Sequence, residues 1–189
     1  MSRWPSKQAM QERILETADR LFNGEGIRAV GVDKIAAEIG ISKRTLYNYY
    51  PSKEELVYAY LTRRYVPARS SNRPPIDQVL HVFDWLERWF GSENFRGCPF
   101  VNAVAELGGP AAQIACDFKE QRRVWMREML MRTPVRNPDM LATQLAILVE
   151  GAIASALVRG DPKVARSAKA AAQVLLSAAG ADGSSPQAS

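Results

Sequence analysis

Residues 32–56 read VDKIAAEIGISKRTLYNYYPSKEEL, and their spacing predicts two short helices joined by a tight turn. Apolar residues recur at the intervals of one helix face from about Val32 to Ile39, and Gly40 ends that helix. Ser42 can cap a second helix, from about Lys43 to Tyr50, which stops before a proline. The turn is too short for the second helix to continue parallel to the first. The segment therefore has the layout of a helix-turn-helix.

The second helix of this motif has a buried face and a polar face suited to DNA. Leu46 and Tyr50 share the face that can pack on the first helix. The other faces carry two cations, an aromatic hydroxyl and an amide, on Lys43, Arg44, Tyr47 and Asn48. Such groups reach phosphates and base edges in the major groove. Spacing alone leaves open the alternative of a solvated amphipathic helix.

The residue types and gaps over about Gln11 to Leu61 resemble the DNA-binding domain of the TetR family. The resemblance implies a homodimer that binds double-stranded operator DNA, represses nearby genes and leaves the DNA when a small molecule binds. It implies that Ser42 caps the recognition helix and that Lys53 binds phosphate. The positions that it assigns to DNA contact or capping, with Arg44 added, are Ser42, Lys43, Arg44, Thr45, Tyr47, Asn48, Tyr49 and Lys53.

Two positions depart from the family pattern. Arg44 stands where the family often has Gly or Ala, so it could add a base contact, for example to guanine. Val30 and Gly31 stand where the family often has Thr or Ser near the start of the preceding helix. A capping hydroxyl is therefore missing, although Gly31 can still serve as a cap.

Charge and composition narrow the function. The 189-residue chain has 25 Lys and Arg against 20 Asp and Glu, a net charge of +5 that is compatible with a nucleic-acid partner. One histidine and two cysteines are few for a metal site or a His-based active site, so we predict no catalytic residue, metal or cofactor. We also expect no signal peptide and no membrane-spanning segment, and hence a cytoplasmic protein.

Helical periodicity recurs along most of the chain, so we expect an all-α fold of about nine helices. A segment rich in Pro, Ser and Arg, Pro67 to Pro75, indicates a domain boundary. We expect a DNA-binding domain at 1–66, a ligand-binding and dimerisation domain at 67–180, and a disordered tail at 181–189. The remaining predicted helices span about 6–23, 53–67, 76–90, 99–107, 111–132, 138–159 and 162–179.

The second predicted domain holds rows of large side chains, and the family resemblance places an effector cavity among its helices. The candidates for lining it are His81, Trp85, Trp89, Cys98, Phe100, Asn102, Glu106, Gln121, Trp125 and Met129. Plain core packing is the alternative for each of them. Residues 97–100, Gly-Cys-Pro-Phe, resemble a signature of some TetR-type regulators. Cys98 precedes a helix there and is either a reactive thiol or a small buried residue.

The last two predicted helices, within about 138–179, are candidates for the homodimer interface, with an internal hairpin as the alternative. Their apolar residues include Leu145, Leu148, Val149, Ala152, Ile153, Ala156, Leu157, Ala165, Ala168, Ala171 and Ala172.

Two other functions compete with a ligand-responsive repressor. One is a cytosolic enzyme that uses Cys98 with His81 as base, and the other is a nonspecific DNA-binding protein without an effector.

Overall fold

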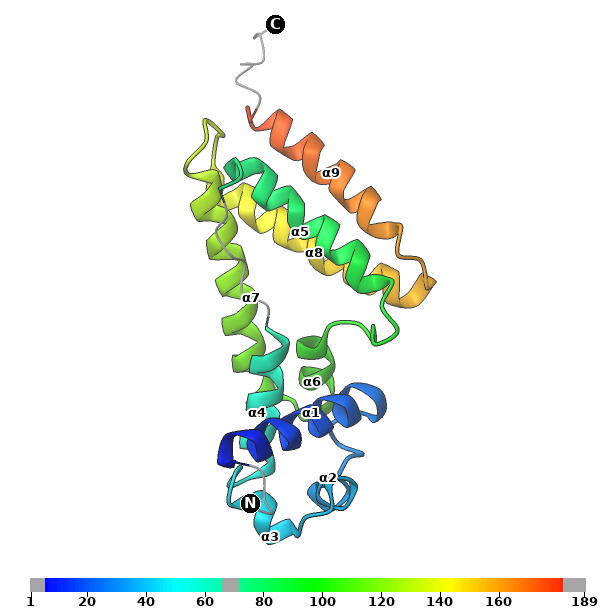
Figure 1. Ribbon diagram of the computed structural model, residues 1–189. Coiled ribbons are helices and arrows are strands. Elements are labelled where there is room, and N and C mark those ends of the chain that lie inside the picture. The colour runs from blue at the N-terminus through cyan, green and yellow to red at the C-terminus, as the bar shows by residue number, and fades with distance from the viewer. Residues whose placement is uncertain (1–5, 66–71, 182–189) are drawn as a thin grey trace, which may run out of the picture. The chain divides into compact units, whose positions relative to one another are not determined.

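The computed structural model describes residues 6–65 and 72–181, and all regular structure within them is helical (Figure 1). The described residues form helices α1 to α9, so the predicted all-α class is confirmed. Residues 66–71 and 182–189 lie outside the described residues, and with them most of the predicted boundary segment and tail. The chain divides into two compact units, 1–66 with 99–115, and 67–98 with 116–189.

The first unit contains α1 to α4, α6 and the start of α7. These helices are α1 (Lys7–Glu25), α2 (Val32–Ile39), α3 (Lys43–Tyr47), α4 (Lys53–Arg64), α6 (Pro99–Leu107) and α7 (Gly109–Leu130). Helix α1 packs on α2 and α4, while α2 packs on α3 and α4 on α6. Their apolar stripes meet in a core that includes Ile14, Ile35, Leu46, Leu56 and Leu61. Burial of these stripes, rather than the propensity of such short helices, holds the unit together.

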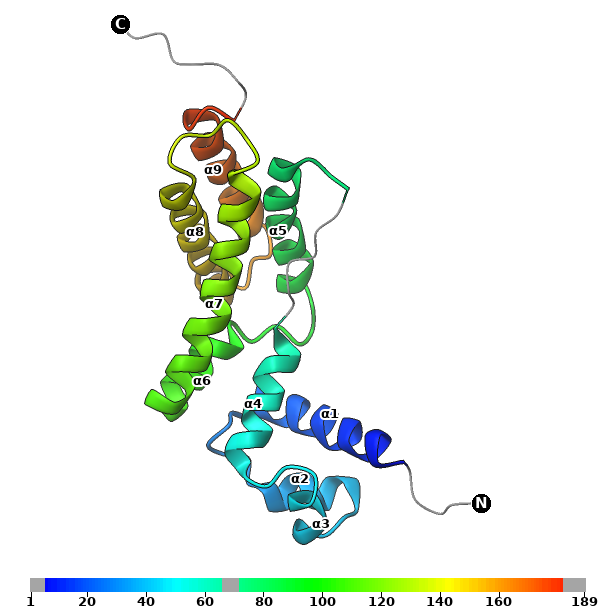
Figure 2. The same ribbon diagram turned by 90° about the vertical axis from the view of Figure 1, so that its left-hand side faces the viewer.

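The second unit contains α5 (Pro75–Phe90), the rest of α7, α8 (Pro138–Arg159) and α9 (Val164–Ala178). Helices α8 and α9 form a hairpin, and α5 lies beside both of them (Figures 1 and 2). Phe83 and Leu86 of α5 are buried with Leu145 and Val149 of α8. Alanines of α9, such as Ala172, allow the close approach of α5 and α8.

Helix ends differ from the sequence predictions where local hydrogen bonds decide them. Helix α3 ends at Tyr47 rather than Tyr50, because the Tyr49 amide bonds to the Leu46 carbonyl three residues back, at 2.9 Å, and not to the Thr45 carbonyl four residues back. Helix α9 begins at Val164 rather than at the preceding proline, and the Asp161 carboxylate accepts from the Lys163 amide at 2.9 Å in the turn before it.

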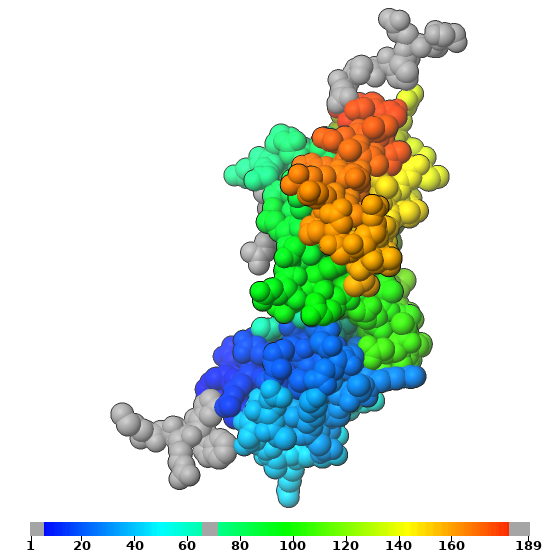
Figure 3. All heavy atoms as spheres, turned by 90° about the vertical axis from the view of Figure 1, so that its right-hand side faces the viewer, coloured from blue at the N-terminus to red at the C-terminus, as the bar shows by residue number. Residues whose placement is uncertain are grey.

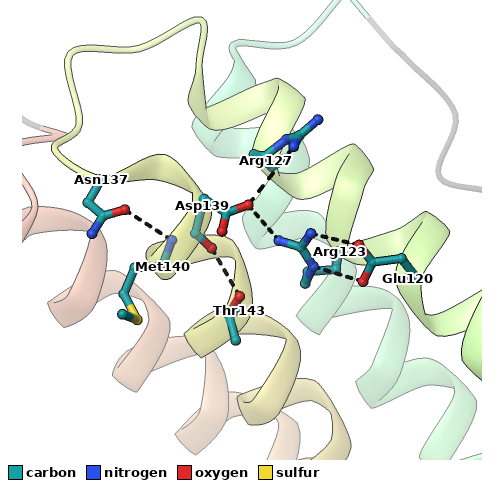
Figure 4. Close-up of polar contacts among 7 residues, drawn as sticks. All are labelled: Glu120, Arg123, Arg127, Asn137, Asp139, Met140 and Thr143. Atoms are coloured by element: carbon teal, nitrogen blue, oxygen red, sulfur yellow. Dashed lines mark hydrogen bonds and ion pairs between the residues drawn. The ribbon is translucent and has the colours of Figure 1, made fainter.

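Charged side chains bridge α7 to the start of α8 (Figure 4). The Arg123 guanidinium donates to both carboxylate oxygens of Glu120, at 2.6 and 2.9 Å, and to Asp139 at 2.8 Å. These bonds hold the pKa of both carboxyl groups below their ordinary values, mainly through the hydrogen bonds with Arg123. Asn137 caps α8 and, with φ +50°, is the one non-glycine residue in the described ranges that adopts a left-handed conformation.

Two sequence predictions concern helix α8. By length and composition alone, it is the one helix of the described ranges that could cross a membrane, a test that the core helix of a soluble protein also passes. The expectation of no membrane-spanning segment stays a prediction. In addition, many side chains predicted for the dimer interface are buried within the protomer: Leu145, Val149, Ala152, Ile153, Ala156, Ala165, Ala168 and Ala172. On α8, the apolar side predicted for the dimer interface is therefore the side that packs on α9 and α5. The opposite side of α8 carries exposed apolar residues instead, among them Ile147 and Val158.

Candidate DNA-binding interface

The turn between α2 and α3 is set by Gly40 and Ser42. Gly40 adopts a left-handed conformation, with φ +73°, and the next amide, of Ile41, bonds back to the Ala36 carbonyl at 3.0 Å. Ser42 is extended, and its hydroxyl accepts from the Thr45 amide at 3.0 Å, which caps α3 as predicted. The chain thus leaves one helix and enters the next within three residues.

The buried side of α3 rests on α2 through Leu46, which is fully buried, while Tyr50, just after the helix, is buried and its hydroxyl donates to the Gln11 carbonyl of α1 at 3.4 Å. The opposite side presents Lys43, Arg44 and Asn48 to solvent, while the side chains of Thr45, Tyr47 and Tyr49 are half-buried. A short helix anchored in this way exposes donors and acceptors on a rigid support, as a recognition helix in a major groove must. The predicted DNA-contacting residues from Lys43 to Tyr49 thus lie on α3 and in the two residues that follow it.

The two cations of α3 differ in their surroundings. The Lys43 ammonium lies 3.0 Å from a carboxylate oxygen of Asp33, in the first turn of α2. That hydrogen bond, and then the charge of Asp33, raise the pKa of Lys43 above its ordinary value. The Arg44 guanidinium has no hydrogen-bond or ion-pair partner among residues 6–65 and 72–181. The Lys43 ammonium is thus paired with a neighbouring acid and the Arg44 guanidinium is not, and the DNA contact of each stays a prediction.

Lys53 has a structural contact that sequence reasoning missed. Its ammonium donates to the main-chain carbonyl of Ile27, in the α1–α2 turn, at 2.6 Å. Ser52 caps α4 by accepting from the Glu55 amide at 3.0 Å, which places Lys53 in the first turn of that helix. An ammonium has three donors, so the bond to Ile27 leaves two for phosphate. The predicted phosphate contact stays a prediction.

The predicted effector-binding residues fall into both units. Phe100, Asn102 and Glu106 are on α6, in the first unit. Phe100 is buried, Asn102 is half-buried, and one carboxylate oxygen of Glu106 accepts from the Arg28 amide at 2.8 Å. Glu106 therefore already has a main-chain partner in the DNA-binding unit, which no local pattern in the sequence indicated.

In the second unit, the indole rings of Trp85 and Trp89 stack with their centroids 5.1 Å apart, and Phe95 meets Trp89 edge-on at 5.0 Å. The indole N–H of Trp125 is buried and has no hydrogen-bond partner among residues 6–65 and 72–181. Met129 is buried. Gln121 is exposed.

Cys98 and His81 occupy different surroundings. Cys98 is 7 % exposed, as expected of a small residue packed at a helix start. The Nδ1 atom of His81 lies 3.6 Å from Asp84 and 3.4 Å from Arg73, on a partly exposed side of α5. Within residues 6–65 and 72–181, no three His, Cys, Asp or Glu side chains gather as metal ligands.

Comparisons with known proteins agree with this geometry. The sequence model of "Bacterial regulatory proteins, tetR family" matches residues 14–60, which cover α2, α3 and most of α1 and α4. The crystal structure of SCO4454, a TetR-family transcriptional regulator from Streptomyces coelicolor, is 30% identical in sequence and has a TM-score of 0.80. The alignment covers 92% of this chain and 95% of that one.

Two curated relatives extend the likeness beyond the helix-turn-helix. The regulator EthR of Mycolicibacterium smegmatis is 28% identical over 180 residues, which are 85% of this chain and 81% of that protein. The uncharacterized regulator YxaF of Bacillus subtilis is 25% identical over 170 residues, or 82% and 89% of the two chains. Both are named as helix-turn-helix transcriptional regulators. The chain belongs to the TetR family and is a DNA-binding transcriptional regulator.

Proposed function

We propose that this regulator is a cytoplasmic homodimer without catalytic activity, which represses transcription at an operator and is released from it by a small-molecule effector. The observation that carries the proposal is the surface of α3. Leu46 fixes the helix on α2, while Arg44 and Asn48 stay exposed on the other side. The polar groups are those that read base edges and phosphates in the major groove.

The test is selection of bound fragments from random double-stranded DNA, followed by a salt titration on the recovered sequence and on random DNA. A repressor retains a strong preference for its site when rising salt weakens both complexes. Two half-sites in the recovered sequence support the dimer, because dimers of this kind bind two half-sites about one helical turn or a multiple of it apart. Equal affinity for all sequences would overturn the proposal.

For the dimer, we propose the exposed side of α8 together with α9. Ile147 and Val158 on α8 are 65% and 85% exposed, and Val174 on α9 is 68% exposed. Gly151 lies between the first two and is also exposed, so a second helix can come close there. Figure 3 shows that α9 forms a large part of the second unit's surface on the side facing the viewer. Exposed apolar side chains that share one side of a helix favour contact with a partner helix over contact with water.

The interface is tested by sedimentation of Ile147→Arg and Val174→Arg, with Met131→Arg as the matched control. Met131 is as exposed as Ile147, at 65%, but it lies in the loop after α7. We expect the first two variants to sediment as monomers and to lose operator affinity, and the control to remain dimeric. A dimer of unchanged mass in both interface variants would refute the assignment.

For the effector, we propose a small, mostly apolar molecule that contacts the aromatic side chains of the second unit. The stacked pair of Trp85 and Trp89 is half-buried, and Trp125 offers an indole N–H that has no partner in the part of the chain that the structure describes. A buried donor without a partner is costly, and a ligand acceptor would remove that cost. Tryptophan fluorescence, followed together with DNA release in a ligand screen, tests this. A releasing ligand that binds Trp85→Phe and Trp125→Phe as it binds wild type would place the site elsewhere.

A further inference from the structure

The turn between α1 and α2 is unusual in being held from two other helices. Lys53, at the start of α4, bonds to the carbonyl of Ile27, and Glu106, on α6, accepts from the amide of Arg28. Arg28 and Glu106 are 78 residues apart in sequence, yet the N···O distance is 2.8 Å. The single peptide group that joins Ile27 to Arg28 is thus held at its oxygen by a cation from one helix and at its N–H by a carboxylate from another.

Gly26 adapts the turn to this carboxylate. Its φ of +93° is a conformation that side-chain-bearing residues rarely adopt. A Cβ atom at this position would lie 3.1 and 3.3 Å from the two carboxylate oxygens of Glu106. Glu106 therefore lies directly over the backbone at Gly26, and the absence of a side chain there permits both the conformation and the close approach.

Helix α2 begins directly after this turn. Its N-cap is Gly31, and no side chain caps the helix. Ile27 and Val30 are buried, so the turn is anchored in the core on one side and by Glu106 and Lys53 on the other. Since α3 rests on α2, a change in where α2 begins is passed to the recognition helix.

We propose that Glu106 is a positioning residue for DNA recognition, which fixes the α1–α2 turn and with it α2 and α3. It acts through the main chain of Arg28 and does not itself contact DNA. The inference rests on the proposed site-specific binding, and it gives Glu106 a role different from the effector contact expected from the sequence.

The first test measures the contact itself in the full-length protein without DNA. Amide hydrogen exchange of Arg28 is followed by NMR in wild type, Glu106→Ala and Glu106→Gln. Alanine removes the acceptor, whereas glutamine retains one carbonyl oxygen. We expect Arg28 to exchange about tenfold faster in Glu106→Ala, the factor for losing one charge-assisted hydrogen bond, and to regain most of its protection in Glu106→Gln. Unchanged exchange in Glu106→Ala would overturn the proposal.

The second test measures binding to the selected operator and to random DNA. The control is Glu128→Ala, which removes an exposed carboxylate from α7 and so matches the change in net charge. We expect Glu106→Ala to lose operator preference relative to this control, and Glu106→Gln to recover it. A mere loss of folded protein would lower both affinities together and would appear in thermal unfolding.

Two outcomes decide the proposal. Equal operator preference in Glu106→Ala and Glu128→Ala would refute the positioning role, even if the Arg28 amide exchanged faster. A wild-type protein without operator preference would overturn the proposed function, and the exchange of Arg28 would still decide the contact. If Glu106→Ala does not fold, Glu106→Asp withdraws the carboxylate by one methylene and takes its place in both tests.

Discussion

The ion pair between Lys43 and Asp33 predicts that Asp33 weakens the binding of DNA by this regulator. Lys43 is on the recognition helix, but its ammonium lies 3.0 Å from the Asp33 carboxylate and both side chains are at least half exposed. A phosphate that binds Lys43 must do so beside that carboxylate, which neutralises part of the ammonium charge and repels the phosphate. We therefore expect Asp33→Asn to strengthen binding to every DNA sequence, by freeing one cation for the backbone.

The magnitude follows from counterion release. Each additional phosphate contact steepens the plot of log affinity against log salt by about 0.9. Over a fourfold rise in salt, from about 0.05 to about 0.2 M, the variant should lose about 3.5-fold more affinity than wild type. The same factor should apply to operator and random DNA, because phosphates carry no sequence information. Base preference should not change.

The assay is fluorescence anisotropy on both DNAs at several salt concentrations, for Asp33→Asn, Lys43→Gln and the double variant. Glu38→Gln is the matched control, because it removes a carboxylate from the same helix but releases Arg20 of α1 rather than a cation of α3. If the effect acts through Lys43, Asp33→Asn should leave the salt slope unchanged in the Lys43→Gln background.

Two results would refute this reasoning. A salt slope in Asp33→Asn equal to that of Glu38→Gln would show that Lys43 gains no phosphate when the acid is removed. An equal effect of Asp33→Asn with and without Lys43 would show that the carboxylate acts by repelling DNA directly. In either case the pairing with Asp33 would not control the use of Lys43.

Further predictions concern base recognition, the core and acid stability. Arg44→Ala should cost about 1–3 kcal/mol at one base position per half-site and relax preference there, measured with single-base operator variants. Equal weakening on every sequence would instead make Arg44 a phosphate contact. Leu46→Ala should lower the free energy of unfolding by about 2–5 kcal/mol in urea denaturation, because the side chain is fully buried between α3 and α2. A loss below about 1 kcal/mol would contradict that packing. Arg123 lowers the pKa of Glu120 and Asp139, so these carboxylates stabilise the folded state above their ordinary pKa values, 4.5 and 3.8. That contribution disappears as pH falls through the depressed values, and Arg123→Gln should lose less stability than wild type below about pH 4.5.

The helix-turn-helix was predictable because its signals are local. Gly40 and Ser42 end and begin helices by backbone conformation and a hydroxyl cap, within three residues of each other. The bounds of α2, predicted as Val32 to Ile39, agree with the structure. The end of α3 was not predictable in the same way. Pro51 marks where helix is forbidden, but the last turn opens earlier, at Asn48.

Contacts between distant segments were beyond the reach of sequence patterns. Residues 99–115 lie among the predicted second-domain helices, yet α6 packs on α4 and belongs to the first unit. Nothing near Glu106 in sequence shows that its partner is the amide of Arg28. Periodicity shows that a helix has an apolar face, but it does not show which helix covers that face. The division into domains at 66 and 180 therefore stays a prediction.

Helix α8 also has apolar residues whose burial the sequence pattern does not decide, and they lie within about one turn of each other. Ile147 is exposed, Val149 is fully buried, and the neighbouring Glu150 pairs with Lys119 and Arg122 of α7. The helix is therefore apolar on two sides and charged on a third, which is why its composition resembles that of a membrane span. Glu150 stands near the middle of the helix, where a bilayer would have to accommodate it together with its two cations. A charge at that depth costs about 2.5–3.5 kcal/mol or more. The pairing instead suits a helix with one side in the protomer core, one on α7 and one on a protein partner, which is the role proposed for it.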